Sequence, residues 1–316
     1  MMRTAAIDCG TNSIRLLIAD IDGTGALTDV ERLMRVVRLG EGVDATGRLS
    51  DAALARTFAA AEDYADLIAR HGSPAVRFVA TSASRDAENR EDFMRGIRAR
   101  LGVDPEVISG AEEAALSFTG AVSVLGTAED ETVLVIDLGG GSTEFVAGDS
   151  SGVLASRSMD MGCVRFTERF LHGDPPTRAE ISAMEAEVKS LIDVAAADVP
   201  LGTVTTLVGV AGSITTVTAH ALKLPEYLPE RIHGAVLSTA EVQAASADLL
   251  HSDRARRASL PYMHPGRVDV IGAGALIWKC IVEAVAEATE GRVRGATASE
   301  HDILDGIALS IARRGK

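Results

Sequence analysis

The sequence predicts an α/β protein made of two related domains, and three observations lead to this fold class. The chain has 316 residues, about the length of two average domains. Residues 7–13 (IDCGTNS) align without gaps on residues 136–142 (IDLGGGS), each lying 129 positions before its counterpart. In both halves strand patterns alternate with helix patterns, which predicts mixed sheets covered by helices.

Each copy of the repeated stretch predicts a β-hairpin. An apolar strand ends at Asp8 in the first copy and at Asp137 in the second. The chain then turns through glycine and small polar residues and resumes as a second strand. The residues beyond the turns also correspond, 14–18 (IRLLI) with 143–147 (TEFVA). Two such copies half a chain apart indicate a duplicated α/β domain.

The first half carries further helix and strand signals. Ser50 is a typical N-cap residue, and apolar positions recur after it at helical spacing until Gly72. Residues 76–80 predict a buried strand, and residues 107–108 predict a short one. Asn89 is expected to cap the helix between these two strands.

The second half continues the alternation. Residues 203–208 predict a strand, which is followed by a glycine-containing turn and by a helix that Ser213 is expected to cap. Prolines in residues 174–176 and 224–229 predict loops. No linker of disordered composition separates the halves, so we expect the two domains to meet at a hinge near residue 120.

Composition narrows the classes of function. The formal net charge of −14 argues against non-specific nucleic-acid binding, so local donors, arginines and a divalent cation must hold any phosphate ligand. Cys9, Cys163 and Cys280 lie far apart without CxxC spacing, which argues against disulfides or zinc and indicates a reducing compartment. No stretch approaches the roughly 20 apolar residues of a membrane span, and polar residues interrupt any signal-peptide core. We therefore expect a soluble, cytoplasmic protein that binds neither nucleic acid nor membrane.

The two predicted hairpin tips are candidates for phosphate binding. Glycine lets successive backbone N–H groups point inward as an anion-binding nest, and hydroxyl groups add donors. One hairpin alone is explained equally well by the use of glycine in turns, but two copies favour a ligand held between tips that face each other across an interdomain cleft. The candidate residues are Gly10, Thr11, Asn12 and Ser13 in the first tip, and Gly139, Gly140, Gly141, Ser142 and Thr143 in the second.

Carboxylates next to the tips are candidates for metal binding. Asp8 and Asp137 would repel phosphate on their own, but Mg²⁺ prefers carboxylate, water and phosphate oxygens as ligands. Glu144 lies two residues beyond Ser142 and faces the same side of a regular strand. A solvated strand carboxylate is the competing interpretation of Glu144.

Ser82 and Arg85 follow the predicted strand that ends at residue 80. Ligand contacts of a parallel sheet lie at the carboxyl ends of its strands, so both are candidates for phosphate binding. Arg85 would act as a bidentate clamp on phosphate oxygens. It could instead form a surface ion pair with Asp86 or Glu88, worth about 0–1 kcal/mol. Arg15, beside the first tip, has the same two interpretations.

Two adjacent glutamates begin a predicted helix and are expected to differ in role. Ser109 and Glu112 have the spacing of a capping box, in which the Glu112 carboxylate accepts a hydrogen bond from the Ser109 N–H. Glu113 points about 100° further round the helix and could face the cleft. There it could deprotonate an attacking water, a contribution of about 10²–10⁴-fold. A solvated first-turn glutamate, favoured by the helix dipole, is the competing interpretation.

Together these motifs resemble the exopolyphosphatase and guanosine pentaphosphate phosphatase (Ppx/GppA) family, within the actin-like ATPase superfamily. The resemblance covers nearly the whole chain and looks closest to short, two-domain exopolyphosphatases of actinobacterial type. We expect the chain to be without the helical C-terminal domain of longer members, which leaves a preference for long polyphosphate open. The main matching stretches are residues 6–15, 80–89, 108–114 and 135–144.

The resemblance implies two ribonuclease-H-like domains with an active cleft between them. They would cover residues 1–120 and 121–299, with a last helix at about 300–316 packing back on the first domain. It also implies Mg²⁺-dependent removal of terminal orthophosphate from inorganic polyphosphate, with Mn²⁺ as an alternative metal. Glu113 matches the catalytic base of the family, and Asp137 and Glu144 match carboxylates around the metal. A homodimer is expected because it is common in the family.

Three other functions stay open at this point. Guanosine pentaphosphate would undergo the same chemistry, and no guanine-binding pocket is recognisable in the sequence. An ATP-dependent kinase of the same superfamily is disfavoured because no acceptor-substrate domain is inserted. A non-catalytic polyphosphate or nucleotide sensor is disfavoured because every polar motif position is retained.

Overall fold

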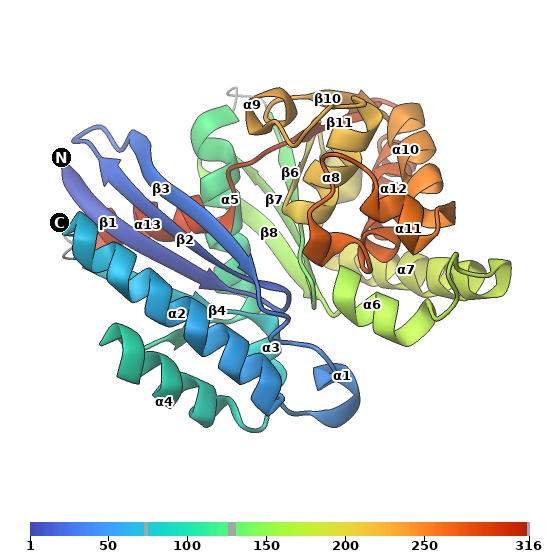
Figure 1. Ribbon diagram of the computed structural model, residues 1–316. Coiled ribbons are helices and arrows are strands. Elements are labelled where there is room, and N and C mark those ends of the chain that lie inside the picture. The colour runs from blue at the N-terminus through green and yellow to red at the C-terminus, as the bar shows by residue number, and fades with distance from the viewer. Residues whose placement is uncertain (73–74, 126–130, 315–316) are drawn as a thin grey trace. The chain divides into compact units, whose positions relative to one another are not determined.

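The computed structural model describes residues 1–72, 75–125 and 131–314. The chain forms two compact units (Figure 1). The first comprises Met1–Gly120 together with Ile303–Lys316, and the second comprises Ala121–Asp302. Within the described residues, no helix combines the length and the apolar character that crossing a bilayer would require.

The first unit is built on a mixed sheet of five strands within the described residues, in the order β3-β2-β1-β4-β5 (Figure 1). β1 pairs antiparallel with β2 and parallel with β4, and β4 pairs parallel with β5. The strands are β1 (Met2–Cys9), β2 (Ser13–Ile21), β3 (Leu27–Val36), β4 (Ala75–Ala80) and β5 (Glu106–Val107).

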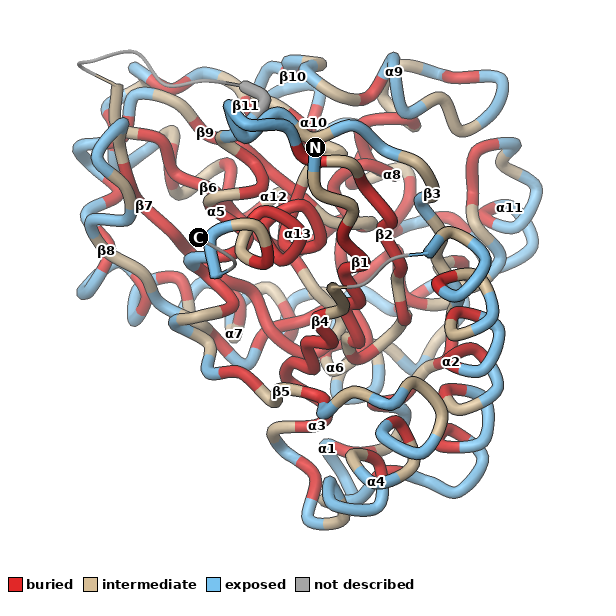
Figure 2. The backbone as a smooth tube through the Cα atoms, turned by 90° about the vertical axis from the view of Figure 1, so that its left-hand side faces the viewer, coloured by how far each residue is buried: buried red, intermediate tan, exposed pale blue. Residues whose placement is uncertain are grey.

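Helices cover both faces of this sheet because apolar side chains alternate along its central strands. Ile7 and Leu16 pack toward Tyr64 of α2, whereas Ala6 and Leu17 pack with α13 on the other face. Figure 2 shows the resulting burial: β1 and most of α13 are buried, and the outer side of α2 is exposed. The helices are α1 (Val43–Thr46), α2 (Asp51–His71), α3 (Ser82–Asp86), α4 (Arg90–Leu101), the start of α5 (Gly110–Leu125) and α13 (Ile303–Arg314).

The second unit has a six-stranded mixed sheet within the described residues, in the order β10-β11-β9-β6-β7-β8. Leu134, Ile136 and Leu138 of β6 pack into one large core with α6, α7 and α12. The strands are β6 (Val133–Leu138), β7 (Thr143–Asp149), β8 (Gly152–Met159), β9 (Thr206–Val210), β10 (Val236–Ser238) and β11 (Gly295–Ala298). The helices are α6 (Cys163–Phe170), α7 (Arg178–Asp198), α8 (Gly212–Ala221), α9 (Pro229–Ile232), α10 (Thr239–His251), α11 (Arg254–Ala258) and α12 (Ile271–Ala288), with short 3-10 turns η1 (Leu201–Thr203) and η2 (Pro265–Arg267).

The two sheets repeat one topology. The order β3-β2-β1-β4-β5 of the first unit corresponds to β8-β7-β6-β9-β11 of the second, which adds β10 at its edge. The predicted hairpins are β1-β2 and β6-β7, both antiparallel. The prediction of mixed sheets covered by helices and of paired hairpins is therefore confirmed.

Most element boundaries follow the sequence signals, with three corrections. Ser50 caps α2, and Gly72 ends it in the left-handed conformation, as predicted. Asn89 precedes α4, but its side chain bonds both backbone groups of Leu49 and does not cap the helix. The helix assigned to a Ser213 cap begins earlier, at Gly212 after Ala211, so Ser213 lies inside it. The strand predicted at residues 203–208 is shifted to β9, because a 3-10 turn occupies its expected start.

Candidate active site

The two hairpin tips have the same closing hydrogen bond. The Gly10 N–H donates to the Ser13 carbonyl at 2.9 Å, and the Gly139 N–H donates to the Ser142 carbonyl at 3.0 Å. Gly10 and Gly139 therefore use their own amides to close the turns. Amide donors for a phosphate have to come from the residues that follow them.

In the first tip, the backbone carbonyls are fixed by the segment that follows β3. The Thr11 carbonyl accepts from the Gly40 N–H at 2.8 Å, and the Asn12 carbonyl accepts from the Val37 N–H at 3.0 Å. Carbonyl and amide point in opposite directions across a trans peptide, so the Asn12 N–H lies on the other side from the Thr11 carbonyl. This N–H donates to no acceptor in the described part of the chain.

The second tip is held in a similar way. The Gly140 carbonyl accepts from the Val164 N–H at 2.9 Å, and the Gly141 carbonyl accepts from Arg165 Nε at 2.8 Å. The N–H groups of Gly141 and Ser142 therefore face away from α6. They find no acceptor among the described residues and could receive an anion.

Side chains of the first tip meet the segment after β4. Thr11 Oγ1 lies 2.9 Å from Ser82 Oγ, so the structure brings these two predicted phosphate-binding residues together. Asn12 Oδ1 and Ser84 Oγ are buried without a hydrogen-bond partner among the described residues. Buried polar atoms are rarely left unpaired, and a ligand is one way to satisfy them. Thr143, by contrast, donates its hydroxyl to the Met161 carbonyl.

The two hairpins differ at one register position. Asp8 lies opposite Arg15 in the first hairpin, and Asp137 lies opposite Glu144 in the second. Directly opposite residues place their side chains side by side on the same face of the sheet. In the first hairpin the result is an ion pair, with Arg15 Nη2 2.6 Å from Asp8 Oδ2.

The second hairpin instead brings two buried carboxylates together. Asp137 is 7 % exposed and Glu144 is 1 % exposed, and Ser158 Oγ donates to Glu144 Oε1 at 2.7 Å. A nearby cation stabilises adjacent carboxylates in their charged form. Oxygen donors of this kind fit a hard divalent cation. The oxygen donors of the second hairpin therefore suit a metal, and in the first hairpin Asp8 pairs with Arg15.

Glu113 lies in the first turn of α5 and is paired with Arg85. Its side chain is largely buried, and Arg85 Nη1 donates to Glu113 Oε2 at 3.2 Å and to the Ile108 carbonyl at 3.1 Å. The guanidinium stabilises the negative charge of the carboxylate. The two other nitrogens of Arg85, Nε and Nη2, donate to no acceptor in the described chain. These donors remain for a ligand.

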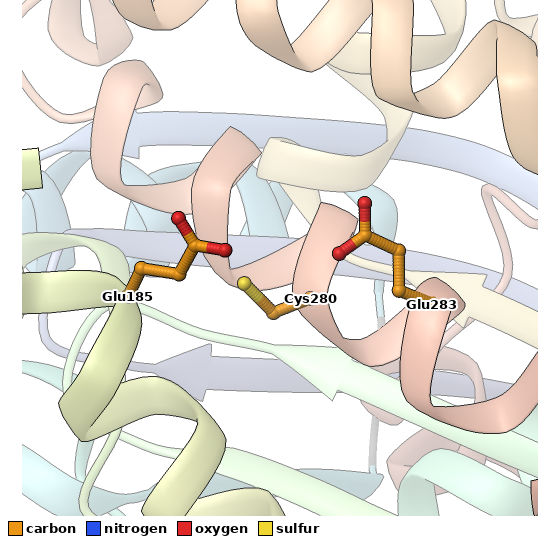
Figure 3. A group of neighbouring side chains, drawn as sticks. All are labelled: Glu185, Cys280 and Glu283. Carbon is orange, nitrogen blue, oxygen red and sulfur yellow. The ribbon is translucent and has the colours of Figure 1, made fainter. Parts of the chain in front are cut away.

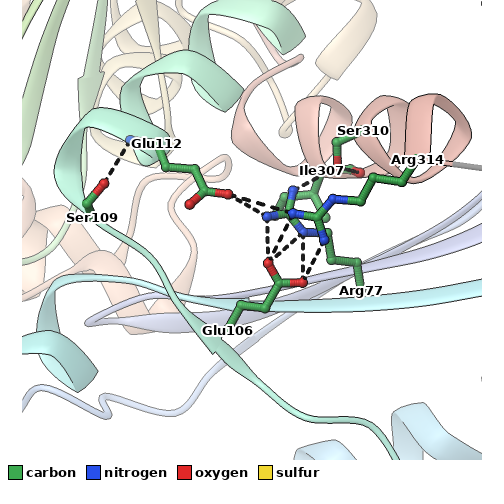
Figure 4. Close-up of polar contacts among 7 residues, drawn as sticks. All are labelled: Arg77, Glu106, Ser109, Glu112, Ile307, Ser310 and Arg314. Carbon is green, nitrogen blue, oxygen red and sulfur yellow. Dashed lines mark hydrogen bonds and ion pairs between the residues drawn. The ribbon is translucent and has the colours of Figure 1, made fainter.

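The capping box expected at Ser109 and Glu112 is only half formed (Figure 4). The Glu112 N–H donates to Ser109 Oγ at 3.2 Å, as in a capping box. The Glu112 carboxylate, however, accepts from Arg77 Nη2 at 2.6 Å rather than from the Ser109 N–H. This part of the prediction was wrong because a buried guanidinium is a stronger donor to a carboxylate than a backbone amide.

Arg267 is a cation that the sequence reasoning did not single out. A Cβ atom on Gly212 would lie 2.3 Å from Arg267 Cζ, so the glycine leaves room for the guanidinium at the start of α8. Arg267 Nη1 also donates to Thr216 Oγ1 at 3.3 Å. A glycine at a strand-to-helix turn was the available signal, but it does not say which distant side chain fills the space.

A separate group in the second unit has the composition of a metal site. Figure 3 shows Glu185 of α7 beside Cys280 and Glu283 of α12. Their possible ligand atoms lie within 4.8 Å of one another. Lys189 Nζ lies 2.9 Å from Glu185, and Lys279 Nζ lies 3.8 Å from Glu283, so both carboxylates are neutralised. Burial raises the pKa of Cys280 to about 12, which keeps its thiol protonated. These properties disfavour a metal.

The second unit also has a pocket of about 640 Å³ that none of the predicted site residues lines. Its polar groups already bond one another: His220 Nδ1 lies 2.5 Å from Tyr262 Oη, and His220 Nε2 lies 3.0 Å from Asp248 Oδ2. Burial lowers the pKa of His220 and raises that of Tyr262 to about 12. These polar groups therefore satisfy one another, and the pocket does not resemble a catalytic site.

The fold and the match to a family of phosphatases together define the class of this protein. The two-sheet α/β architecture with repeated hairpins is the ribonuclease-H-like fold of the actin-like ATPase superfamily, as predicted. Residues 17–311 match the model of the Ppx/GppA phosphatase family, and the chain belongs to that family.

Relatives extend this similarity over the full chain. Exopolyphosphatase 2 of Mycobacterium tuberculosis is 49 % identical over 99 % of both chains. A crystal structure of an exopolyphosphatase-like protein has a TM-score of 0.94 and 46 % identity, covering 99 % of this chain and 98 % of that one. The Ppx/GppA enzyme of Aquifex aeolicus has a TM-score of 0.79 and 30 % identity, covering 98 % and 99 %.

Proposed function

We propose that this protein is an exopolyphosphatase that hydrolyses the terminal phosphoanhydride bond of inorganic polyphosphate. The observation that carries the proposal is the 49 % identity with an exopolyphosphatase over 99 % of both chains. The hairpin amides, the Glu113–Arg85 pair and the carboxylate pair of the second hairpin supply the groups that this chemistry needs.

Glu113 is the proposed general base. Its buried carboxylate would accept a proton from water as the water attacks the terminal phosphorus. Arg85 would have two tasks, since one Nη atom orients Glu113 while the remaining donors bind a phosphate oxygen. Positioning and charge stabilisation account for most catalysis of phosphoryl transfer.

The hairpin tips are the proposed phosphate-binding elements. The amides of Asn12, Gly141 and Ser142 have no acceptor within the described chain and are suited to phosphate oxygens. Hydroxyl donors would come from Ser13 and from the linked Thr11–Ser82 pair. The other residues assigned to this role from the sequence are Gly10, Gly139, Gly140, Thr143 and Arg15.

A divalent cation is proposed at Asp137 and Glu144, with Mg²⁺ as the expected metal and Mn²⁺ as the alternative. Such an ion would neutralise charge that develops on the transferring phosphoryl group. Asp8 was also assigned to the metal from the sequence, but its ion pair with Arg15 makes it the weaker candidate.

Glu113→Gln tests the proposed function. Wild-type protein should release orthophosphate from polyphosphate in Mg²⁺ buffer, whereas Glu113→Gln should bind polyphosphate and lose at least about 10²-fold in kcat. Glu91→Gln is a matched control, because Glu91 is an exposed first-turn glutamate of α4. Near-normal turnover by Glu113→Gln would remove this residue from the mechanism.

Guanosine pentaphosphate is the alternative substrate. The same groups could hydrolyse its terminal phosphate, so the two substrates have to be compared at matched concentrations. A clear preference for the nucleotide would overturn polyphosphate as the main substrate. Polyphosphate binding without phosphate release would instead support a sensor.

The cellular compartment and the oligomeric state of the enzyme are also part of the proposal. All three cysteines are free and buried, which supports a reducing, cytoplasmic environment. A homodimer remains a prediction, and light scattering of the purified protein would give its mass.

A further inference from the structure

We infer that Arg77 is a positioning residue: it holds Glu112, and through Glu112 it sets the position of the neighbouring base Glu113. This inference rests on the proposed function, because it assigns to Glu113 the role of base. Arg77 lies on β4, is only 4 % exposed and touches neither hairpin tip in any described hydrogen bond. Its effect on the reaction must therefore be indirect.

Arg77 is the buried centre of a polar network in the first unit, and its carboxylate partners are half-buried (Figure 4). Its Nη2 donates to Glu112 Oε1 at 2.6 Å and to Glu106 Oε2 at 2.8 Å. Its Nη1 donates to Ser310 Oγ at 2.8 Å, and its Nε donates to Glu106 Oε1 at 3.1 Å. A planar guanidinium with every nitrogen engaged has one orientation, so it fixes the groups around it.

The network joins β4 to two consecutive elements, β5 and α5, and to the distant C-terminal helix α13. Glu106 is on β5, Glu112 is in the first turn of α5, and Ser310 is on the C-terminal helix α13. Arg314 of α13 adds a second cation, with Nη1 3.0 Å from Glu106 Oε1. The C-terminal helix is thereby tied to the helix that carries the base.

The start of α5 is where this constraint meets the chemistry. Glu112 and Glu113 are consecutive residues, and the Glu113 N–H donates to the Ser109 carbonyl at 2.9 Å. Arg77 holds one glutamate from one side, and Arg85 holds the other at 3.2 Å. Two arginines therefore fix the first turn of α5 between them. A shift of this turn would move the base relative to its substrate, and displacements of about 1 Å can cost about 10²-fold in rate.

Charge balance gives Arg77 a second effect. Arg77 and Arg314 balance the charges of Glu106 and Glu112, so the network is neutral. Without Arg77, the Glu112 carboxylate would lose its closest cation one residue from the base. An additional negative charge there would disfavour the approach of a polyanionic substrate.

Glu112→Gln and Arg77→Met test the inference. Each should lower kcat by about 10-fold to 10²-fold. KM should rise in Arg77→Met alone, where the Glu112 carboxylate is left without its closest cation. Their effects should not add, because both break one contact. Arg77→Lys should recover only part of kcat, because an ammonium group cannot make the paired hydrogen bonds of a planar guanidinium. Full activity of Glu112→Gln, which leaves the buried arginine in place, would overturn the inference.

Repeating Glu112→Gln in the Glu113→Gln background distinguishes an effect on the base from a purely structural role of the Arg77–Glu112 pair. If Arg77 acts through the base, the residual rate of Glu113→Gln should not fall further. An equal fold-loss in both backgrounds would contradict the inference. A crystal structure of Glu112→Gln gives a readout independent of substrate: the Glu113–Arg85 contact should be lost, and an unchanged contact would overturn the inference. Failure of the proposed function would appear separately, as wild-type protein that releases no phosphate.

Discussion

At the scale of single residues, one exchange distinguishes the duplicated hairpins. Position 15 carries arginine and its counterpart, position 144, carries glutamate, although both lie opposite an aspartate. The first hairpin therefore holds a neutral ion pair, while the second holds two carboxylates. The sequence repeat predicts that Asp8 and Asp137 correspond. Only the strand register shows that their opposite partners differ in charge.

The carboxylate pair leads to a prediction about metal affinity. Glu144→Gln should raise the Mg²⁺ concentration for half-maximal phosphate release by more than about tenfold. Ser158→Ala should raise it by about tenfold, because Ser158 orients the Glu144 carboxylate. Asp149→Asn, at the half-buried end of the same strand, is the control. Equal Mg²⁺ requirements in all four proteins would exclude Glu144 as a ligand.

At the scale of elements, sequence signals succeed where the partners are local. Ser50 and Gly72 delimit α2 because cap and helix are contiguous. The capping roles predicted for Asn89 and for the Glu112 carboxylate were wrong, because distant groups bond these side chains instead. Arg77 could not be found from its spacing, because its partners lie 29 to 233 positions away.

The contact between α13 and α5 leads to a second prediction. A Cβ atom on Gly306 would lie 1.9 Å from the Leu116 carbonyl oxygen, so Gly306→Ala forces the two helices apart. We expect a loss of about 1–3 kcal/mol in the free energy of unfolding, together with reduced kcat. Gly23→Ala is the control, since no atom lies within 4 Å of its Cβ position. Urea unfolding should show the loss in the first variant alone.

Helix α7 gives a prediction about pH. Hydrogen bonds from the backbone and hydroxyl of Thr177 lower the pKa of Glu180 from 4.5 to about 2 in the folded protein. A lowered folded pKa adds stability at pH above the unfolded value, and this stability is lost as the pH falls from 4.5 toward about 2. Glu180→Gln should therefore be less stable than wild type at neutral pH, and the difference should shrink in acid. Glu187→Gln, on the same helix, is the control, and a difference independent of pH would contradict the assignment.

At the scale of the whole molecule, the duplication has produced units of one topology with different chemistry. The first unit carries the proposed base and its two arginines, and the second carries the proposed metal ligands. The sequence repeat alone therefore predicts a phosphate-binding hairpin but not a reaction. The match to the Ppx/GppA family identifies the class of reaction. The strand register shows that Arg15 lies opposite Asp8 and Glu144 lies opposite Asp137.

This difference between the units predicts that a divalent cation stabilises the β6-β7 hairpin more than the β1-β2 hairpin. Hydrogen exchange with and without Mg²⁺ should show added protection across β6-β7, because the proposed ion would bind the folded hairpin through Asp137 and Glu144. Protection across β1-β2 should stay unchanged, since Arg15 already neutralises Asp8 at 2.6 Å. Glu144→Gln should abolish the effect in the second hairpin and leave the first as it was. Equal protection of both hairpins in wild-type protein would instead make Asp8 a metal ligand, because the ion would then have to displace Arg15 from its carboxylate.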